Sequence, residues 1–153
     1  MKKLLELLKE QGLSLGSVES MTAGLFASTF VETPGASKVF KGSLVTYAVE
    51  EKVRLLGIEE NLINSFGVVS KEVAGEMARK GQNVLGVDVC ISITGNAGPT
   101  VEPGGMPVGR AYIGIAKNDQ KYVFEVNLRG NRNKIRKGAV LAMQEKLLEI
   151  LEK

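Results

Sequence analysis

Two clusters of small polar residues and glycine are the parts of this chain best suited to chemistry. One is Ser17–Gly24, with the sequence SVESMTAG, and the other is Thr94–Pro99, with the sequence TGNAGP. Histidine is absent, and the single cysteine, Cys90, lies within an apolar run. This composition excludes a Ser-His-Asp triad and a Cys-His pair, and nearly excludes a zinc site of His and Cys ligands. An enzyme built from this chain must move protons with lysine, tyrosine or a carboxylate.

Lys52 is the main candidate for a proton acceptor. It comes five residues after Tyr47, at the expected start of a helix that follows a strand. A lysine acts as a general base when burial or positive neighbours lower its pKa towards neutrality. Spacing alone favours the alternative, a solvated surface lysine. Ser37 offers a hydroxyl in the turn Pro34–Ser37, where capping is its alternative role.

The two polar clusters are candidates for holding a ligand. Ser20 and Thr22 follow an expected strand and precede an expected helix, while Thr94 and Gly95 follow the most apolar strand. Backbone N–H groups in such turns can hold a phosphate or a developing oxyanion. The alternatives are helix capping by the hydroxyls and a tight turn that needs glycine. Neither cluster matches a P-loop or a dinucleotide-binding glycine pattern.

Other residue types offer weaker candidates for a site. Arg132 and Arg136 are one helical turn apart, so they could clamp a phosphate or simply form a basic helix surface. Cys90 is interpreted as a core residue because no activating base is evident beside it. The carboxylates Glu19, Glu50 and Glu51 could bind a metal, although no ligand spacing requires one.

Alternating helices and strands must position these residues. Hydrophobic periodicity and turn chemistry predict strands over 13–18, 40–48, 87–94, 110–116 and 122–128, and helices over 1–12, 25–31, 50–56, 59–66, 71–82 and 135–150. The late pair of strands forms a hairpin around Asn118 and Asp119. We therefore expect residues 1–153 to form a single three-layer α/β/α domain with a mixed, mostly parallel sheet. Ligands of such sheets bind at the carboxyl ends of the strands, where both polar clusters would lie.

Composition limits the class of protein. The chain has 153 residues, of which 44% are hydrophobic, so a core can form without disulfides. Its net charge of +3 is scattered, which suits a small anionic ligand and argues against direct nucleic-acid binding. Lys2 and Lys3 precede leucines as in a signal peptide, but charged residues soon interrupt the apolar run. With one cysteine and no membrane-length apolar run, we expect a soluble cytoplasmic domain with no membrane association.

Several segments together carry a resemblance to a known family. In order along the chain they are ESMTAG (19–24), PGAS (34–37), VTY (45–47) with KVRLLG (52–57), GVVS (67–70), TGNAGP (94–99) and PVG (107–109). The chain resembles the C-terminal domain of the competence-damage inducible protein CinA, and the likeness covers nearly its whole length. That family includes stand-alone nicotinamide-nucleotide amidases.

The resemblance implies an activity and a set of residues. The activity is hydrolysis of the carboxamide of nicotinamide mononucleotide to nicotinate mononucleotide and ammonia, with no cofactor and no metal. As a hypothesis, Ser37 attacks the amide carbon and Lys52 accepts the proton of the Ser37 hydroxyl. Tyr47 either relays that proton or orients the reacting groups. Backbone N–H groups of a glycine-containing loop would stabilise the oxyanion. The substrate-binding positions would be Ser20, Thr22, Thr94, Gly95, and Arg132 or Arg136.

The chain also departs from the family pattern. Met21 and Ala23 replace Cys and Gly of the usual ESCTGG motif, polar Asn96 replaces an aliphatic residue, and segment 100–106 carries one carboxylate where the family is acidic. Substrate choice or loop closure could therefore differ. Two alternatives to the mononucleotide amidase stay open: a non-catalytic binding or assembly module linked to competence or DNA repair, and an amidase for another small substrate. The first and last helices could bury either a homodimer face or the core.

Overall fold

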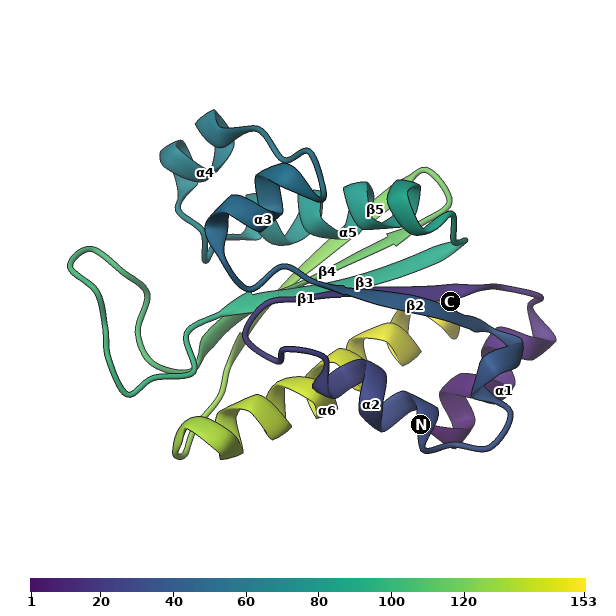
Figure 1. Ribbon diagram of the computed structural model, residues 1–153. Coiled ribbons are helices and arrows are strands. Elements are labelled where there is room, and N and C mark those ends of the chain that lie inside the picture. The colour runs from purple at the N-terminus through teal and green to yellow at the C-terminus, as the bar shows by residue number, and fades with distance from the viewer.

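The computed structural model describes residues 1–153 as one five-stranded sheet between two layers of helices (Figure 1). The strand order is β2-β1-β3-β4-β5. The strands are β1 (Leu15–Glu19), β2 (Phe40–Val45), β3 (Val89–Gly95), β4 (Arg110–Lys117) and β5 (Gln120–Asn127). β1 pairs in parallel with both β2 and β3, whereas β4 is antiparallel to β3 and to β5. Only β4 therefore runs against the other strands, and the predicted mixed, mostly parallel three-layer fold is confirmed.

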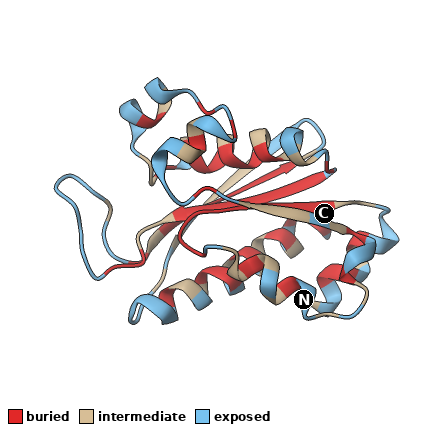
Figure 2. Cartoon of the chain, viewed as in Figure 1, coloured by how far each residue is buried: buried red, intermediate tan, exposed pale blue.

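One layer consists of α1 (Lys2–Glu10), α2 (Leu25–Val31) and α6 (Arg132–Leu151) (Figure 1). The leucine face of α1 and the apolar face of α6 both lie in the larger core cluster, together with inward-facing residues of β3 and β4. These two faces are core rather than surface, which decides between the two roles expected for them. Figure 2 shows the buried residues concentrated in the sheet and on the sides of the helices that face it.

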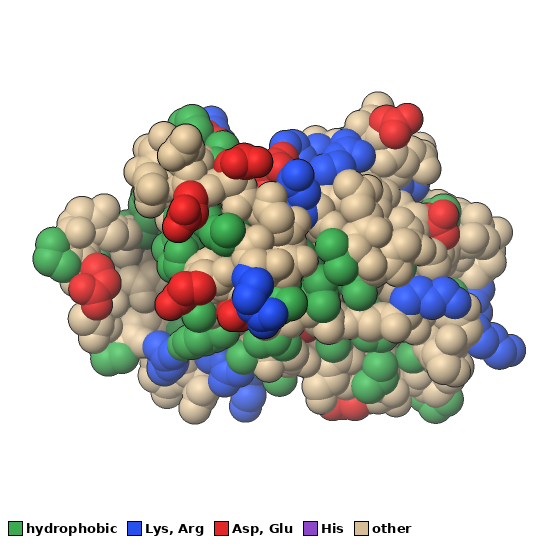
Figure 3. Space-filling model, turned by 45° about the horizontal axis from the view of Figure 1, so that its top comes forward, with side chains coloured by type: hydrophobic (Ala, Val, Ile, Leu, Met, Phe, Trp, Pro, Cys, Tyr) green, Lys and Arg blue, Asp and Glu red, His purple; other side chains and the backbone are tan.

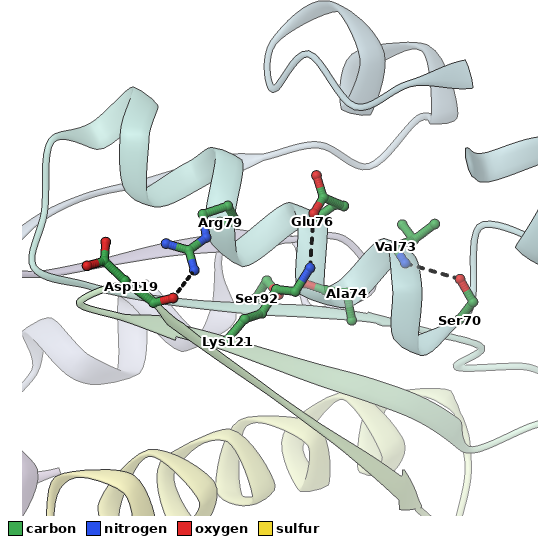
Figure 4. A network of polar contacts seen from close by, with 8 residues as sticks. All are labelled: Ser70, Val73, Ala74, Glu76, Arg79, Ser92, Asp119 and Lys121. Atoms are coloured by element: carbon green, nitrogen blue, oxygen red, sulfur yellow. Dashed lines mark hydrogen bonds and ion pairs between the residues drawn. The ribbon is translucent and has the colours of Figure 1, made fainter. Parts of the chain in front are cut away.

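The other layer consists of α3 (Val49–Arg54), α4 (Glu60–Phe66) and α5 (Lys71–Leu85). The predicted N-cap of α5 is confirmed, because the Ser70 hydroxyl accepts a hydrogen bond from the backbone N–H of Val73. Figure 4 shows α5 fastened to the hairpin: Lys121 pairs with Glu76, and Arg79 donates to the carbonyl of Asp119. No helix in the structure is long and apolar enough to cross a membrane.

Candidate active site

The carboxyl ends of the three parallel strands bring both polar clusters to one edge of the sheet. Ser20 follows β1, Tyr47 comes shortly after β2, and Thr94 is the last residue but one of β3. They line a cavity of about 250 Å³ beside β3. We refer to it as the active-site cavity; the other residues that line it are Met21, Val49, Lys52, Val68, Val69, Gly95, Asn96, Ala97 and Arg132.

Lys52 reaches this cavity from α3 and is completely buried. Its Nζ lies 3.0 Å from Oγ of Ser20 and 2.5 Å from the carbonyl oxygen of Thr46. No carboxylate forms an ion pair with it. Burial therefore penalises the ammonium with no negative charge paired to it, and it lowers the pKa of Lys52 from 10.5 to about 8. A lysine in this state can accept a proton from the serine hydroxyl near neutral pH.

Glu19 anchors the turn that carries Ser20. Its carboxylate is fully buried and accepts hydrogen bonds from the Thr22 hydroxyl at 2.6 Å and from the backbone N–H groups of Gly24, Phe26 and Ala27 at 3.2, 2.9 and 3.1 Å. These amides belong to the first turn of α2, which has unpaired N–H groups that favour a negative charge. The buried carboxylate thus locks the end of β1 to the start of α2, with Ser20 between them.

Thr22 and Arg136 also stabilise the turn that carries Ser20, and their side chains do not line the cavity. The Thr22 side chain is fully buried and committed to Glu19. The Arg136 guanidinium donates to the carbonyls of Met21 and Thr22, at 3.0 Å each. Neither Thr22 nor Arg136 lines the cavity, so the structure does not bring these two expected substrate contacts together with Ser20 and Lys52. The backbone N–H groups of Met21 and Thr22 make no hydrogen bond within the chain.

Arg132 is the arginine at the cavity. Its guanidinium donates to the Tyr47 hydroxyl at 3.1 Å and to the carbonyl oxygen of Gly98. It therefore links the segment after β2 to the loop after β3, across the mouth of the cavity. Tyr47 is 58% exposed, so its ring lies at the rim rather than in the interior. Tyr47 and Arg132 are placed to contact a ligand that enters from solvent.

Thr94 and Gly95 form the floor of the cavity. The buried Thr94 hydroxyl donates to the carbonyl of Val68 at 2.9 Å and ties β3 to the segment before α5. A Cβ atom at Gly95 would lie 2.5 Å from both the Cβ of Ala111 and the Sδ of Met21. Glycine is therefore needed at this position for the close approach of strand β4 and the Ser20 turn.

Ser37 does not join Lys52, which corrects the expected nucleophile. Ser37 is exposed within a short 3₁₀ helix, η1 (Ala36–Lys38), that precedes β2, whereas Lys52 follows β2. The six residues of β2 span about 20 Å at 3.3 Å per residue. In Figure 1 the chain enters β2 beside α1 at the right and leaves it towards α3 at the left. Ser37 and Lys52 therefore lie at opposite edges of the sheet, and Ser20 is the hydroxyl that contacts the lysine.

Sequence reasoning missed the pairing of Ser20 with Lys52 and the bracing role of Glu19. It also missed Thr46, whose carbonyl accepts from Lys52 and whose buried hydroxyl has no hydrogen-bond partner. The sequence did contain one indication of the role of Glu19, since this carboxylate directly precedes Ser20 at the end of an apolar strand.

Cys90 is confirmed as a core residue: it is fully buried, and burial raises the pKa of its thiol to about 12.

Comparison with known proteins agrees with the sequence resemblance. The chain is 38% identical over 150 residues to a CinA-like protein of Petrotoga mobilis and 41% identical over 138 residues to a CinA-like protein of Kosmotoga olearia. These alignments cover 98% and 90% of this chain but only 37% and 34% of the relatives. The chain thus spans about a third of the length of the relatives it matches.

Solved structures match over almost the full length of both chains. The competence or damage-inducible protein from Enterobacter asburiae superposes with a TM-score of 0.95 at 26% identity, covering 98% of this chain and 94% of that one. The competence/damage inducible protein CihA from Agrobacterium tumefaciens superposes with a TM-score of 0.92 at 27% identity, covering 99% and 93%. The family model described as the CinA C-terminal domain matches residues 1–151. Since sequence, fold and family model agree over the whole sheet and both helical layers, the chain belongs to the CinA C-terminal domain family.

Proposed function

We propose that this protein is a serine amidase in which Ser20 is the nucleophile and Lys52 is the general base. The observation that carries the proposal is the 3.0 Å contact between the Ser20 hydroxyl and the buried Lys52 amine. A serine hydroxyl is a weak nucleophile until a neighbouring base removes its proton. A lysine with a pKa of about 8 supplies that base in a chain without histidine. Serine–lysine pairs are a recognised variant of the serine–histidine system.

In the proposed reaction, Ser20 Oγ forms a bond to the carboxamide carbon and its proton passes to Lys52 Nζ. The free backbone N–H groups of Met21 and Thr22, immediately after the nucleophile, are candidates to stabilise the oxyanion. The C–N bond then breaks, the nitrogen takes the proton from Lys52, and ammonia leaves. Water hydrolyses the remaining ester with Lys52 again as base, so the products are a carboxylic acid, ammonia and free Ser20.

We propose nicotinamide mononucleotide as the substrate, as the family resemblance implies. Its carboxamide would lie between Ser20 and Lys52. Its phosphate would pair with Arg132, the cationic side chain at the mouth of the cavity that is not engaged with a carboxylate. Tyr47 shares a hydrogen bond with Arg132 and so helps to hold the guanidinium at the rim. A guanidinium suits a phosphate because its N–H groups can donate to two oxygens at once.

Ammonia release from nicotinamide mononucleotide tests the proposal, with the Ser20→Ala, Lys52→Ala and Ser37→Ala variants measured beside the unmodified protein. Ser20→Ala and Lys52→Ala should each lower kcat by roughly a thousandfold or more, because the nucleophile and its base act as a unit. Ser37→Ala is the matched serine control at the opposite edge of the sheet and should keep its turnover.

Two results would contradict this assignment. Near-normal turnover by a folded Ser20→Ala protein would remove Ser20 as the nucleophile. A folded protein that binds the mononucleotide, as seen by a raised thermal midpoint, but releases no ammonia would favour a binding module instead.

A further inference from the structure

A second and larger cavity opens directly beside the active-site cavity. It has a volume of about 460 Å³ and shares Val68, Val69, Gly95 and Asn96 with its neighbour. Phe66 lies on one side, and the loop of residues 100–106 forms the other. We call this space the annex. In Figure 1 the loop extends away from the sheet, and Figure 3 shows hydrophobic side chains between it and the helices.

Asn96 holds the loop in this position. Its side-chain amide donates to the carbonyls of Thr100 and Met106 at 3.0 Å each, and its side-chain oxygen accepts from the backbone N–H of Gly98 at 2.8 Å. Both arms of the loop are therefore tied to one side chain that also lines both cavities. An aliphatic residue at this position could make none of these hydrogen bonds. The polar residue noted in the sequence thus has a structural consequence, because it fixes the loop that forms one side of the annex.

The lining of the annex selects against a phosphate and favours a flat, uncharged group. No lysine or arginine lines it, and its one charged residue, Glu102, would repel an anion. The apolar part of the lining consists of side chains from Phe66, Val68, Val69, Pro103 and Met106. Four glycines also line the annex, and their backbone N–H and C=O groups are not covered by side chains of their own. Phe66 is 50% exposed, so its ring is available for stacking. This is the combination that holds a nucleobase: an aromatic surface with a few backbone hydrogen bonds.

The two cavities differ in charge in a way that matches a dinucleotide. The active-site cavity alone, at about 250 Å³, is smaller than the roughly 300–1,000 Å³ of most small-molecule pockets. Arg132 lies in that cavity and not in the annex. For a ligand with its amide at Ser20 and its phosphates near Arg132, the annex is the adjoining cavity that offers space for a second, uncharged nucleoside.

We infer that the annex is a subsite for the second nucleoside of a pyridine dinucleotide, so that the protein hydrolyses the carboxamide of dinucleotides as well as that of the mononucleotide. The inference rests on the proposed amidase function and extends its substrate class. The reaction is the same: water enters, the C–N bond of the carboxamide breaks, and the acid form of the dinucleotide and ammonia leave.

The test compares two substrates, nicotinamide mononucleotide and oxidised nicotinamide adenine dinucleotide. Steady-state ammonia release gives kcat/KM for each, in the unmodified protein, in Phe66→Ala and in Leu141→Ala. Leu141 is a matched control, since it is an apolar side chain that is 62% exposed on α6 and lines neither cavity. The ratio of the dinucleotide value to the mononucleotide value should fall about tenfold in Phe66→Ala, as expected for a lost stacking partner, and should not change in Leu141→Ala.

A binding measurement separates failure of this inference from failure of the amidase proposal. Calorimetric titration of the Ser20→Ala protein with the dinucleotide needs no turnover, and the added Phe66→Ala change should weaken binding about tenfold. Hydrolysis of the mononucleotide together with no binding of the dinucleotide would overturn the annex assignment and leave the amidase intact. Dinucleotide binding that Phe66→Ala does not alter would overturn it as well. If neither compound releases ammonia, the amidase proposal fails, and the same titration still decides whether the annex holds a nucleoside.

Discussion

Replacing Lys52 with methionine should remove activity and also remove one pH-dependent contribution to the free energy of unfolding. Burial lowers the pKa of Lys52 from 10.5 to about 8, which corresponds to roughly 3 kcal/mol at about 1.4 kcal/mol per pH unit. A lysine whose pKa falls on folding destabilises the native state when it is protonated. The penalty is therefore complete below about pH 8 and disappears as the pH rises towards 10.5, where the unfolded chain also loses the proton.

Methionine has an unbranched side chain one heavy atom shorter than that of lysine and carries no charge, so it avoids this penalty. It also leaves the Ser20 hydroxyl and the Thr46 carbonyl without the amine they contact, at about 1 kcal/mol each. The net gain in the free energy of unfolding at pH 7 should be roughly 1 kcal/mol. Because the lost hydrogen bonds do not titrate, the difference between the two proteins should change by roughly 2 to 3 kcal/mol between pH 7 and pH 10, in favour of the unmodified protein at the higher pH.

Urea denaturation followed by circular dichroism, at unit steps from pH 7 to pH 10, measures this difference. Lys137→Met is the control for replacing a lysine with methionine at the surface, since Lys137 is exposed on α6. Other groups titrate in this range, but they are common to all three proteins and cancel in the comparison. A constant difference between the Lys52→Met and unmodified proteins from pH 7 to pH 10 would refute the reasoning, because it would mean that Lys52 does not titrate there.

Three further predictions concern the site and its support. The kcat/KM for ammonia release should rise as the pH increases through about 8 and then level off, because only the neutral amine of Lys52 can accept a proton; a pH–rate profile that is flat between pH 6 and pH 9 would exclude this base. Glu19→Gln should lower the free energy of unfolding by about 3 kcal/mol in urea, since an amide cannot accept all the donors that converge on the buried carboxylate; a loss below about 1 kcal/mol would contradict its bracing role. Ala23→Gly should raise the free energy of unfolding by about 1 kcal/mol, because Ala23 has a φ of 49°, where an L side chain is strained; an unchanged denaturation midpoint would show that the surroundings absorb the strain.

The Ser20–Lys52 pair and the proposed dinucleotide subsite depend on different parts of the chain. The pair depends on buried residues that follow β1 and β2, Ser20 directly after β1 and Lys52 on α3. The annex depends on Asn96 and a loop of small residues outside the core. Substitutions in the loop should therefore alter substrate range before they alter stability or chemistry, as is common where loops carry specificity on a rigid scaffold.

Local patterns in the sequence were sufficient for the elements of the fold. Each predicted helix and strand is present, with ends that agree to within a few residues, and the predicted N-cap at Ser70 is confirmed. The reason is that hydrophobic periodicity and capping act over a few neighbouring residues and can be read along the chain. The buried position of β3 was equally evident, because a strand covered by helices on both faces is apolar on both.

The composition of the chain and its motifs also determined which residues could react. The absence of histidine directed attention to lysine as the base, and Lys52 does lie in a cavity with Tyr47, Thr94 and Arg132. Only the tertiary structure decided which serine meets that lysine. Ser20 follows strand β1, whereas Ser37 precedes strand β2. Because β1 and β2 pair in parallel, Ser20 lies at the same edge of the sheet as Lys52, which comes after β2, and Ser37 lies at the opposite edge. Strand direction and pairing are set by contacts between distant segments, and the lowered pKa of Lys52 arises from the burial that those contacts create.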